Sequence, residues 1–342
     1  MAYTTIDNPG LFFNTVLHTG NGGTQSITGV GFQTDWSWIK RRDGSAFHVV
    51  TDSVRGATKQ IYPNDSQAEG TRAQGLQSFD SDGYTLGNEG DTNGNSQTYV
   101  GWTWKAGGSA SSNSDGSITS TVSANTTAGF SILTFTTPSA DGDFTVGHGL
   151  GSIPQWVIVK TRGNADNWQI FHHKLGNANI VKLNTTDASA STGIFGSTNP
   201  TSSVFTLNKN SFGGGLTAVA YCFAEKKGFS KFGSYTGNGN ADGTFVYTGF
   251  KPAMIIIKRT DGSDRWVISD NKRDPDNPVN GELNPNDSAT EDTSSTPFDF
   301  LSNGFKIRRT GNVFNASGGT YIYMAFAESP FVNSKGVPTN AR

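Results

Sequence analysis

The same order of sequence features occurs three times along the chain, and this repeat constrains the fold more strongly than any other property of the sequence. Each copy contains a hydrophobic segment that ends in lysine, and these segments are Asp35–Lys40, Pro154–Lys160 and Pro252–Lys258. Each copy closes with an aromatic segment, in turn Tyr99–Trp104, Val219–Phe223 and Ile322–Phe326. Because a recurring order of this kind is the signature of repeated structural units, the sequence predicts three related modules.

Short hydrophobic segments separated by glycine-rich turns predict that each module is built from β-strands. The chain has 43 Gly and 23 Phe but only 3 Met, so glycine interrupts the runs that long helices need. Tryptophan alternates with a small polar residue at Trp36–Trp38 and again at Trp102–Trp104, which is the two-residue period of a strand. We therefore predict an all-β fold of three tandem antiparallel β-sandwich or jelly-roll-like modules, with these aromatic residues between the two sheets of a module.

The predicted modules are joined in two different ways. Ala106–Gly116 is a Gly/Ser-rich segment with the composition of a flexible tether, whereas Lys226–Ser230 joins the second and third modules almost directly. We therefore expect modules two and three to pack as a pair and module one to be held more loosely. The predicted organisation is an N-terminal arm, a first module, a Gly/Ser-rich linker, a second module, a third module and a C-terminal tail, at residues 1–14, 15–105, 106–129, 130–227, 228–329 and 330–342.

Charge, cysteine content and the first residues argue against several classes of protein. The net charge is −2 and the basic runs are short, as at Lys40–Arg42, so no nucleic-acid partner is expected. The single cysteine, Cys222, excludes an internal disulfide and lies in an apolar segment, where a buried thiol is expected. The first ten residues lack a secretory signal and no apolar run is long enough to cross a membrane, so we expect a soluble protein made in a cytoplasm.

Catalytic and metal-binding patterns are weak throughout the sequence. No Gly-x-Ser-x-Gly motif occurs, and the adjacent His172 and His173 would point to opposite faces of a strand, which does not suit one metal ion. Asp80 and Asp82 stand two residues apart before a strand, where aspartate and glycine favour a hairpin turn. Clustered carboxylate oxygens also suit calcium, and this alternative stays open for Asp80 and Asp82. We expect no catalytic residues, no cofactor and no enzymatic activity.

Aromatic residues and variable loops are the remaining candidates for ligand binding. Phe47, Trp168 and Trp266 begin matching strands in the three modules, where they either belong to the core or stack on sugar rings. Three long polar loops differ between the modules and are better candidates, because recognition loops vary on a constant scaffold. These loops are Pro63–Gln77, Asn184–Ser203 and Asn271–Thr296.

Several segments of the first module resemble an uncharacterised domain family that is common in marine tailed phages. The resemblance is carried by Asn14–Gly31, Trp36–Lys40, Asp52–Thr58, Gly75–Gly87 and Tyr99–Trp104. It is good over residues 1–105 and general over the other two modules. Proteins of that family look like tail-fibre or particle-surface components with concanavalin-like sandwich folds. The resemblance implies a virion location, and it supplies no catalytic or ligand-binding residue.

These observations lead to one preferred function and three alternatives. We expect a structural phage virion protein, a tail-fibre or host-contact component that binds a surface glycan or another receptor. It would join other virion proteins as a homo-oligomer, with a trimer favoured for a fibre. The first alternative is a capsid decoration or head-fibre protein. The second is a tailspike that degrades polysaccharide, which the lack of a convergent carboxylate pair disfavours. The third is a bacterial lectin module, which the missing export signal disfavours.

Overall fold

Antiparallel β-strands form nearly all the regular structure of the computed structural model, which describes residues 4–330. Helices are limited to single turns, namely η1 (Pro9–Leu11), α1 (Gly90–Asn93), α2 (Lys209–Phe212) and α3 (Asn312–Asn315). The prediction of an all-β fold is therefore confirmed. Between residues 4 and 330, no helix has the length and apolar character needed to cross a membrane.

One arrangement of four strands occurs three times. In each set, the strand that comes first in the sequence pairs with the strand that comes last in the sequence. The three sets, in order across the sheet, are β1 (Phe13–Thr19), β9 (Thr98–Trp104), β3 (Trp36–Arg41) and β4 (His48–Asp52); β12 (Phe130–Thr136), β19 (Thr217–Phe223), β14 (Trp156–Thr161) and β15 (Gln169–His172); and β20 (Ser230–Thr236), β26 (Thr320–Pro330), β22 (Phe250–Arg259) and β23 (Val267–Asp270). We call the units that contain them lobe 1 (13–104), lobe 2 (130–223) and lobe 3 (230–330).

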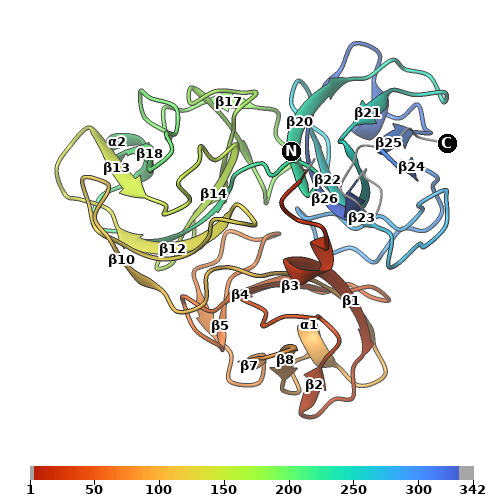
Figure 1. Ribbon diagram of the computed structural model, residues 1–342, viewed down its shortest axis with the longest axis horizontal. Helices are drawn as coiled ribbons and strands as arrows, with labels where there is room; N and C mark the ends of the chain where they lie inside the picture. Colours follow the sequence, from red (N-terminus) through yellow and green to blue (C-terminus); the bar gives the residue numbers. More distant parts are fainter. Residues whose placement is uncertain (1–3, 331–342) are drawn as a thin grey trace.

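A smaller sheet covers the outer face of each four-stranded set, so each lobe is a β-sandwich. The small sheets are β2 (Gln25–Ile27), β8 (Gly83–Leu86) and β7 (Leu76–Asp80) in lobe 1; β13 (Asp143–Gly147) and β18 (Val204–Asn208) in lobe 2; and β21 (Phe245–Tyr247), β25 (Gly304–Ile307) and β24 (Phe298–Leu301) in lobe 3. Figure 1 shows the small sheets on the outside of the molecule and the larger sheets turned toward its centre. Lobe 1 also has a short pair, β5 (Lys59–Gln60) and β6 (Gly70–Thr71).

The inner faces of the three larger sheets share one aromatic core at the centre of the molecule. Trp36 of lobe 1 packs at a ring-centroid distance of 4.8 Å from Tyr221 of lobe 2, and Phe13 of lobe 1 stacks at 5.0 Å on Phe326 of lobe 3. We predicted that the alternating tryptophans fill the space between the two sheets of one module, and this was wrong. They face the neighbouring lobes, while Ile39, which directly follows Trp38 in β3, faces the small sheet of its own lobe.

Equivalent backbone hydrogen bonds join the three lobes into a closed ring. The N–H of Glu69 in lobe 1 donates to the Arg162 carbonyl of lobe 2 over 2.7 Å, and the N–H of Ser189 in lobe 2 donates to the Thr260 carbonyl of lobe 3 over 2.8 Å. The N–H of Glu291 in lobe 3 donates to the Arg42 carbonyl of lobe 1 over 3.0 Å. Each acceptor directly follows an equivalent strand, β14, β22 or β3. The lobes therefore meet head to tail, and the ring closes after three of them.

The Gly/Ser-rich segment at 106–129 is part of this assembly and not a flexible tether. It forms β10 (Ser111–Asn113) and β11 (Ser120–Asn125), which extend the sheet of lobe 2 beside β12. At the other edge, β16 (Asn179–Lys182) and β17 (Ala190–Ser191) extend the same sheet. Composition predicts flexibility only where the backbone lacks partners, and β12 supplies them here. Lobe 1 contacts both other lobes, so the expectation of a loosely held first module was also wrong.

The two predicted end segments are described only in part. Within the N-terminal arm, Ile6 is buried in the central core and η1 leads directly into β1. Most of the predicted C-terminal tail, 331–342, lies outside the described residues, as do residues 1–3.

Candidate functional site

Two of the three aromatic candidates for ligand binding are buried at interfaces between lobes. Trp168 is 1% exposed and Trp266 is fully buried. The indole N–H of Trp168 donates to the Tyr62 carbonyl of lobe 1 over 2.8 Å, and that of Trp266 donates to the Lys182 carbonyl of lobe 2 over 2.9 Å. Neither ring is accessible to a sugar, so the hypothesis of stacking at Trp168 and Trp266 was wrong. Both tryptophans form hydrogen bonds that join one lobe to the next.

The residue of lobe 1 at the position of these tryptophans is His48, and Phe47 precedes it by one. The backbone N–H groups of His48, Trp168 and Trp266 each donate to an asparagine side chain of the same lobe, at 2.8, 3.0 and 2.7 Å. His48 is fully buried and its Nδ1 accepts a 2.9 Å hydrogen bond from the Trp38 indole. Burial holds the pKa of His48 well below its usual value, so this imidazole is neutral at pH 7.

Because Phe47 is displaced by one position, its ring lies at the surface instead of between lobes. It is partly exposed and packs 5.0 Å from the ring of Tyr62. Beside it is a hollow of about 510 Å³ at the interface of lobes 1 and 3, which we call the Phe47 cleft. The lining residues are Ser45, Ala46, Phe47, Asn64, Asp65, Asp91, Asp287 and Ser288.

Acidic residues from three separate parts of the chain line the Phe47 cleft. Asp65 follows β5, Asp91 lies in the single turn α1, and Asp287 comes from lobe 3. Asp91 accepts a 3.2 Å hydrogen bond from the backbone N–H of Phe47, and burial raises the pKa of the Asp91 carboxyl. No sequence signal predicts this grouping, because the three residues are far apart in the chain and share no motif.

A buried lysine lies behind the Phe47 cleft. Lys40 donates from Nζ to the carbonyls of Arg41 at 2.9 Å and of Ser288 at 3.3 Å. Burial lowers its pKa to about 8, and the carboxylates of Asp287 and Asp91 oppose that shift. An aromatic face beside carboxylate, amide and hydroxyl groups can hold a ligand that is apolar on one side and rich in hydroxyl groups at its edge, as a sugar ring is.

The lysine that ends each hydrophobic segment has the same position in all three lobes. Lys40, Lys160 and Lys258 are fully buried, and each donates from Nζ to the carbonyl of the following residue, at 2.9, 2.9 and 2.6 Å. Burial lowers the pKa of each to about 8. Lys40 and Lys258 also donate across a lobe interface, to the carbonyls of Ser288 and Thr186 over 3.3 Å, whereas Lys160 donates to Asn164 of its own lobe.

Residues 8–330 match the model of a family described as a domain of unknown function (DUF7483). The chain belongs to this family. The match spans all three lobes, whereas the resemblance found in the sequence was good only over residues 1–105. No curated protein and no solved structure matches the chain.

The three predicted variable loops bond to the neighbouring lobe, and two of them also line the Phe47 cleft. Pro63–Gln77 supplies Asn64 and Asp65 to the Phe47 cleft, and Asn271–Thr296 supplies Asp287 and Ser288. Each of the three loops also provides the backbone N–H that bonds to the next lobe, from Glu69, Ser189 and Glu291. They are therefore anchored parts of the ring, and only some of their side chains are available to a ligand.

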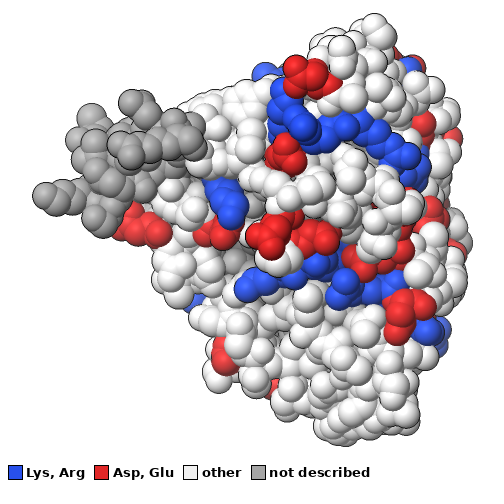
Figure 2. Space-filling view, turned by 90° about the vertical axis from the view of Figure 1, so that its right-hand side faces the viewer, with Lys and Arg blue, Asp and Glu red and all other residues white. Residues whose placement is uncertain are grey.

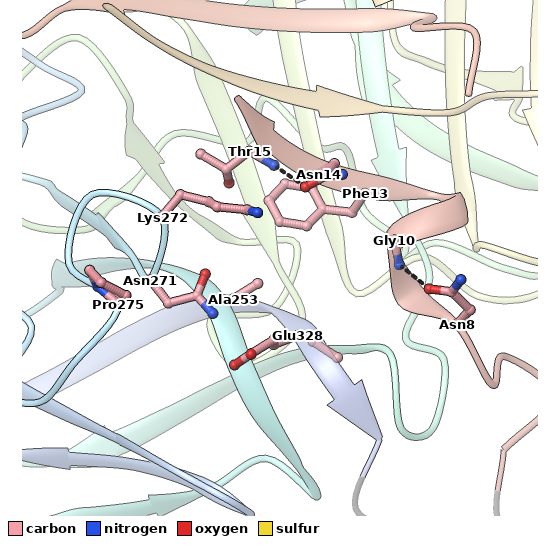
Figure 3. A pocket seen from close by; sticks show the side chains of 11 residues that line it. Asn8, Gly10, Phe13, Asn14, Thr15, Ala253, Asn271, Lys272, Pro275 and Glu328 are labelled. Carbon is pink, nitrogen blue, oxygen red and sulfur yellow. Dashed lines mark hydrogen bonds between the residues drawn. The ribbon is translucent and has the colours of Figure 1, made fainter. Parts of the chain in front are cut away.

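A second hollow, of about 350 Å³, lies at another part of the interface between lobes 1 and 3 (Figure 3). Asn271, Lys272 and Pro275 come from the loop after β23 and face Thr15 of β1, with Glu328 of β26 at the lower side in this view. The hollow holds one ammonium and one carboxylate group, and its single aromatic residue, Phe13, is buried. It offers less for recognition than the Phe47 cleft.

Asp80 and Asp82 both accept hydrogen bonds within lobe 1. Asp82 accepts from the backbone N–H groups of Gly29 at 3.0 Å and Gly31 at 2.6 Å, which lowers the pKa of its carboxyl. Asp80 accepts from the hydroxyls of Ser78 and Thr85 at 2.8 and 2.7 Å. In the part of the chain that the structure describes, no group of three or more His, Cys, Asp or Glu residues could hold a metal ion. Calcium at this pair stays a prediction.

Proposed function

We propose that the chain is a non-enzymatic structural protein of a phage particle, in the tail-fibre or host-contact class, which binds a surface glycan through the Phe47 cleft. The observation that carries the proposal is the partly exposed Phe47 ring beside Asn64, Asp65 and Asp91 in a hollow of about 510 Å³. The resemblance of the first module to tailed-phage surface proteins supports the virion location, and the closed ring provides the rigid scaffold that a binding site needs.

The buried ion pairs support a scaffold role rather than catalysis for most charged groups of the interior. Asp52 pairs with Arg55 at 2.5 Å and accepts a 2.7 Å hydrogen bond from the Tyr221 hydroxyl of lobe 2. Asp270 pairs with Arg273 at 2.6 Å and accepts a 3.0 Å hydrogen bond from the Trp102 indole of lobe 1. These groups are occupied in joining the lobes, and no substrate reaches them.

Polysaccharide hydrolysis at the Phe47 cleft is the second candidate function. It is favoured by one observation, which is that burial raises the pKa of Asp91 in a hollow that also holds Asp65 and Asp287. Glycosidases use one carboxyl group with a raised pKa as the acid and a second carboxylate as base or nucleophile. Incubation with host polysaccharide followed by size-exclusion chromatography separates the two functions, because a binding protein leaves the polymer at its original length.

The binding function is tested by titrating the purified chain with host surface polysaccharide in a calorimeter. We expect Phe47→Ala to weaken binding by about tenfold or more, as truncation of a central aromatic contact does. Leu17→Ala is the matched control, since Leu17 is also exposed but lies on β1 outside the cleft. Equal affinity of the Phe47→Ala variant and the unaltered chain would remove the cleft from the proposal.

The virion location has its own test. Gold-labelled antibody against the chain should mark the tail of intact phage particles in electron micrographs. Label confined to the capsid would favour the decoration or head-fibre alternative, and particles without label would contradict a virion role.

A further inference from the structure

Strand β21 of lobe 3 carries two exposed aromatic side chains on the outside of the molecule. Phe245 is 43% exposed and Tyr247 is 54% exposed, while Val246 between them is 6% exposed. Successive side chains of a strand point to opposite faces, so Val246 packs into lobe 3 and both rings lie on its outer face. Large exposed aromatic residues that share one face mark a contact site more often than isolated ones do.

The other two lobes show that the fold does not need aromatic residues at these positions. Val246 pairs with Phe305 as Ile27 pairs with Tyr84 in lobe 1 and Val146 with Phe205 in lobe 2. Phe245 therefore corresponds to Ser26 and Thr145, and Tyr247 corresponds to Thr28 and Gly147. Polar or small residues fill the same places in two lobes, so the two rings of lobe 3 serve something other than folding.

The surface around the two rings is flat and has both charges. Tyr247 lies opposite Gly304, which lies opposite Leu301 on the next strand, so no side chain rises between Tyr247 and Leu301. At the other end of the strand, Phe245 lies opposite Lys306, whose ammonium pairs with Asp242 at 2.6 Å.

Charges of both signs are also mixed over the wider surface. On the face shown in Figure 2, Lys and Arg form two rows with Asp and Glu at their borders, and uncharged residues cover most of the area. A partner held mainly by its own charge, such as a nucleic-acid backbone, would need a continuous area of one sign. Because Lys306 and Asp242 compensate each other beside Phe245, the immediate surroundings of the two rings suit an uncharged partner better.

We propose that the outer face of β21, β25 and β24 binds a neutral polysaccharide chain, with Phe245 and Tyr247 stacked on successive sugar rings. The size of the aromatic area favours this occupant over a second copy of the protein. The exposed parts of the two rings amount to about 200 Å², whereas a stable protein interface buries roughly 800 Å² on each partner. Lys306 and Asp242 provide a donor and an acceptor for hydroxyl groups at the edge. This proposal deepens the host-contact function and rests on it for the choice of a glycan.

Affinity electrophoresis of the full chain in gels that contain a polysaccharide tests the proposal. The probes are dextran, laminarin and galactomannan as neutral polymers and alginate as an anionic one. We expect at least one neutral polymer to retard the unaltered chain and alginate to retard it less. The variant Phe245→Ser/Tyr247→Thr introduces the residues that lobe 1 carries at the same places, so it should keep its thermal unfolding midpoint. The variant should bind the neutral polymer at least about tenfold more weakly than the unaltered chain does.

The variant Phe47→Ala separates this proposal from the Phe47 cleft. Loss of binding in the Phe245/Tyr247 variant supports the β21 face, whatever the result at Phe47. Loss in the Phe47 variant alone overturns the β21 face and leaves the proposed function intact. Failure of all neutral polymers to retard the unaltered chain overturns it too. A concentration-dependent dimer in sedimentation that is absent from the Phe245/Tyr247 variant would also overturn the proposal, because the occupant of the β21 face would then be a second copy of the chain.

Discussion

Asp52 and Asp270 end equivalent strands, and each forms a fully buried ion pair with the arginine three residues later. Lobe 2 has His172 and Leu175 at these two positions, and burial lowers the pKa of His172 to about 3, so the imidazole stays neutral. The fold therefore accepts an ionic or a neutral pair at one position. The neighbouring lobe determines which, since it supplies a hydrogen-bond donor to Asp52 and to Asp270.

Removing one member of a buried ion pair should cost far more than removing both. We expect Asp52→Ala to lower the free energy of unfolding by about 3 kcal/mol, because the buried Arg55 loses its shorter ion pair and keeps only the one with Glu69 at 3.1 Å. The double variant Asp52→His/Arg55→Leu copies lobe 2 and should be less destabilised than the single variant. Urea unfolding followed by tryptophan fluorescence measures both. A single variant that loses less than about 1 kcal/mol would show that water reaches Arg55.

The histidines predict how stability depends on pH. Burial lowers the pKa of all five, namely His18, His48, His148, His172 and His173. The unfolded chain therefore binds more protons than the folded chain once the pH falls below about 6.5. We expect the free energy of unfolding to decrease from pH 7 to pH 5, and His172→Leu to make that decrease smaller. A flat profile over this range would contradict the burial of these rings.

Phe47 was predicted from the sequence as a candidate and lines the cleft, but its alignment with Trp168 and Trp266 is wrong by one residue. Phe47, Trp168 and Trp266 were matched as aromatic residues, but the hydrogen bonds place His48 with the two tryptophans. A similarity of residue type suggests the wrong alignment, and the backbone hydrogen bonds to an asparagine of the same lobe correct it. The Asp-x-x-Arg pattern that recurs at Asp52–Arg55 and Asp270–Arg273 is the sequence signal of the two buried ion pairs.

The sequence predicts a strand where residue types alternate with a two-residue period. It does not predict which sheet packs against each face of that strand. The alternation at Trp36–Trp38 correctly predicted a strand, because the two-residue period depends on the backbone alone. Which sheet covers each face depends on residues far away in the sequence, and the tryptophans turned out to face other lobes. The segment at 106–129 shows the same limit, since its pairing with β12 is invisible in its Gly/Ser composition.

Packing of this segment can be tested at Gly107. A Cβ atom there would lie 2.3 Å from the carbonyl oxygen of Ala124 in β11, which is too close for any side chain. We expect Gly107→Ala to lower the free energy of unfolding by about 1–3 kcal/mol through this overlap. Gly90→Ala is the matched control, because a Cβ at Gly90 meets nothing within 4 Å. Equal stability of the two variants would restore the view of 106–129 as a free tether.

Three lobes that meet head to tail form a closed ring within one chain. A homotrimer would build such a ring from three separate chains. Each lobe offers a donor surface to one neighbour and an acceptor surface to the other, and the third contact closes the ring. The interfaces between lobes are thus already used inside the chain. A homotrimer of the whole protein, which we expected for a fibre, would have to assemble through the outer surfaces of the lobes.

A shared core should make the three lobes unfold together. All seven tryptophans belong to the central core, which contains residues of every lobe, so no lobe can leave without exposing aromatic surface of the other two. We expect one cooperative transition, with the same midpoint for tryptophan fluorescence, which reports the centre, and for far-ultraviolet circular dichroism, which reports all strands. Calorimetric and van't Hoff enthalpies should agree. Two separated transitions would mean that a lobe holds its structure on its own small core, and the ring would then be an association of independent domains.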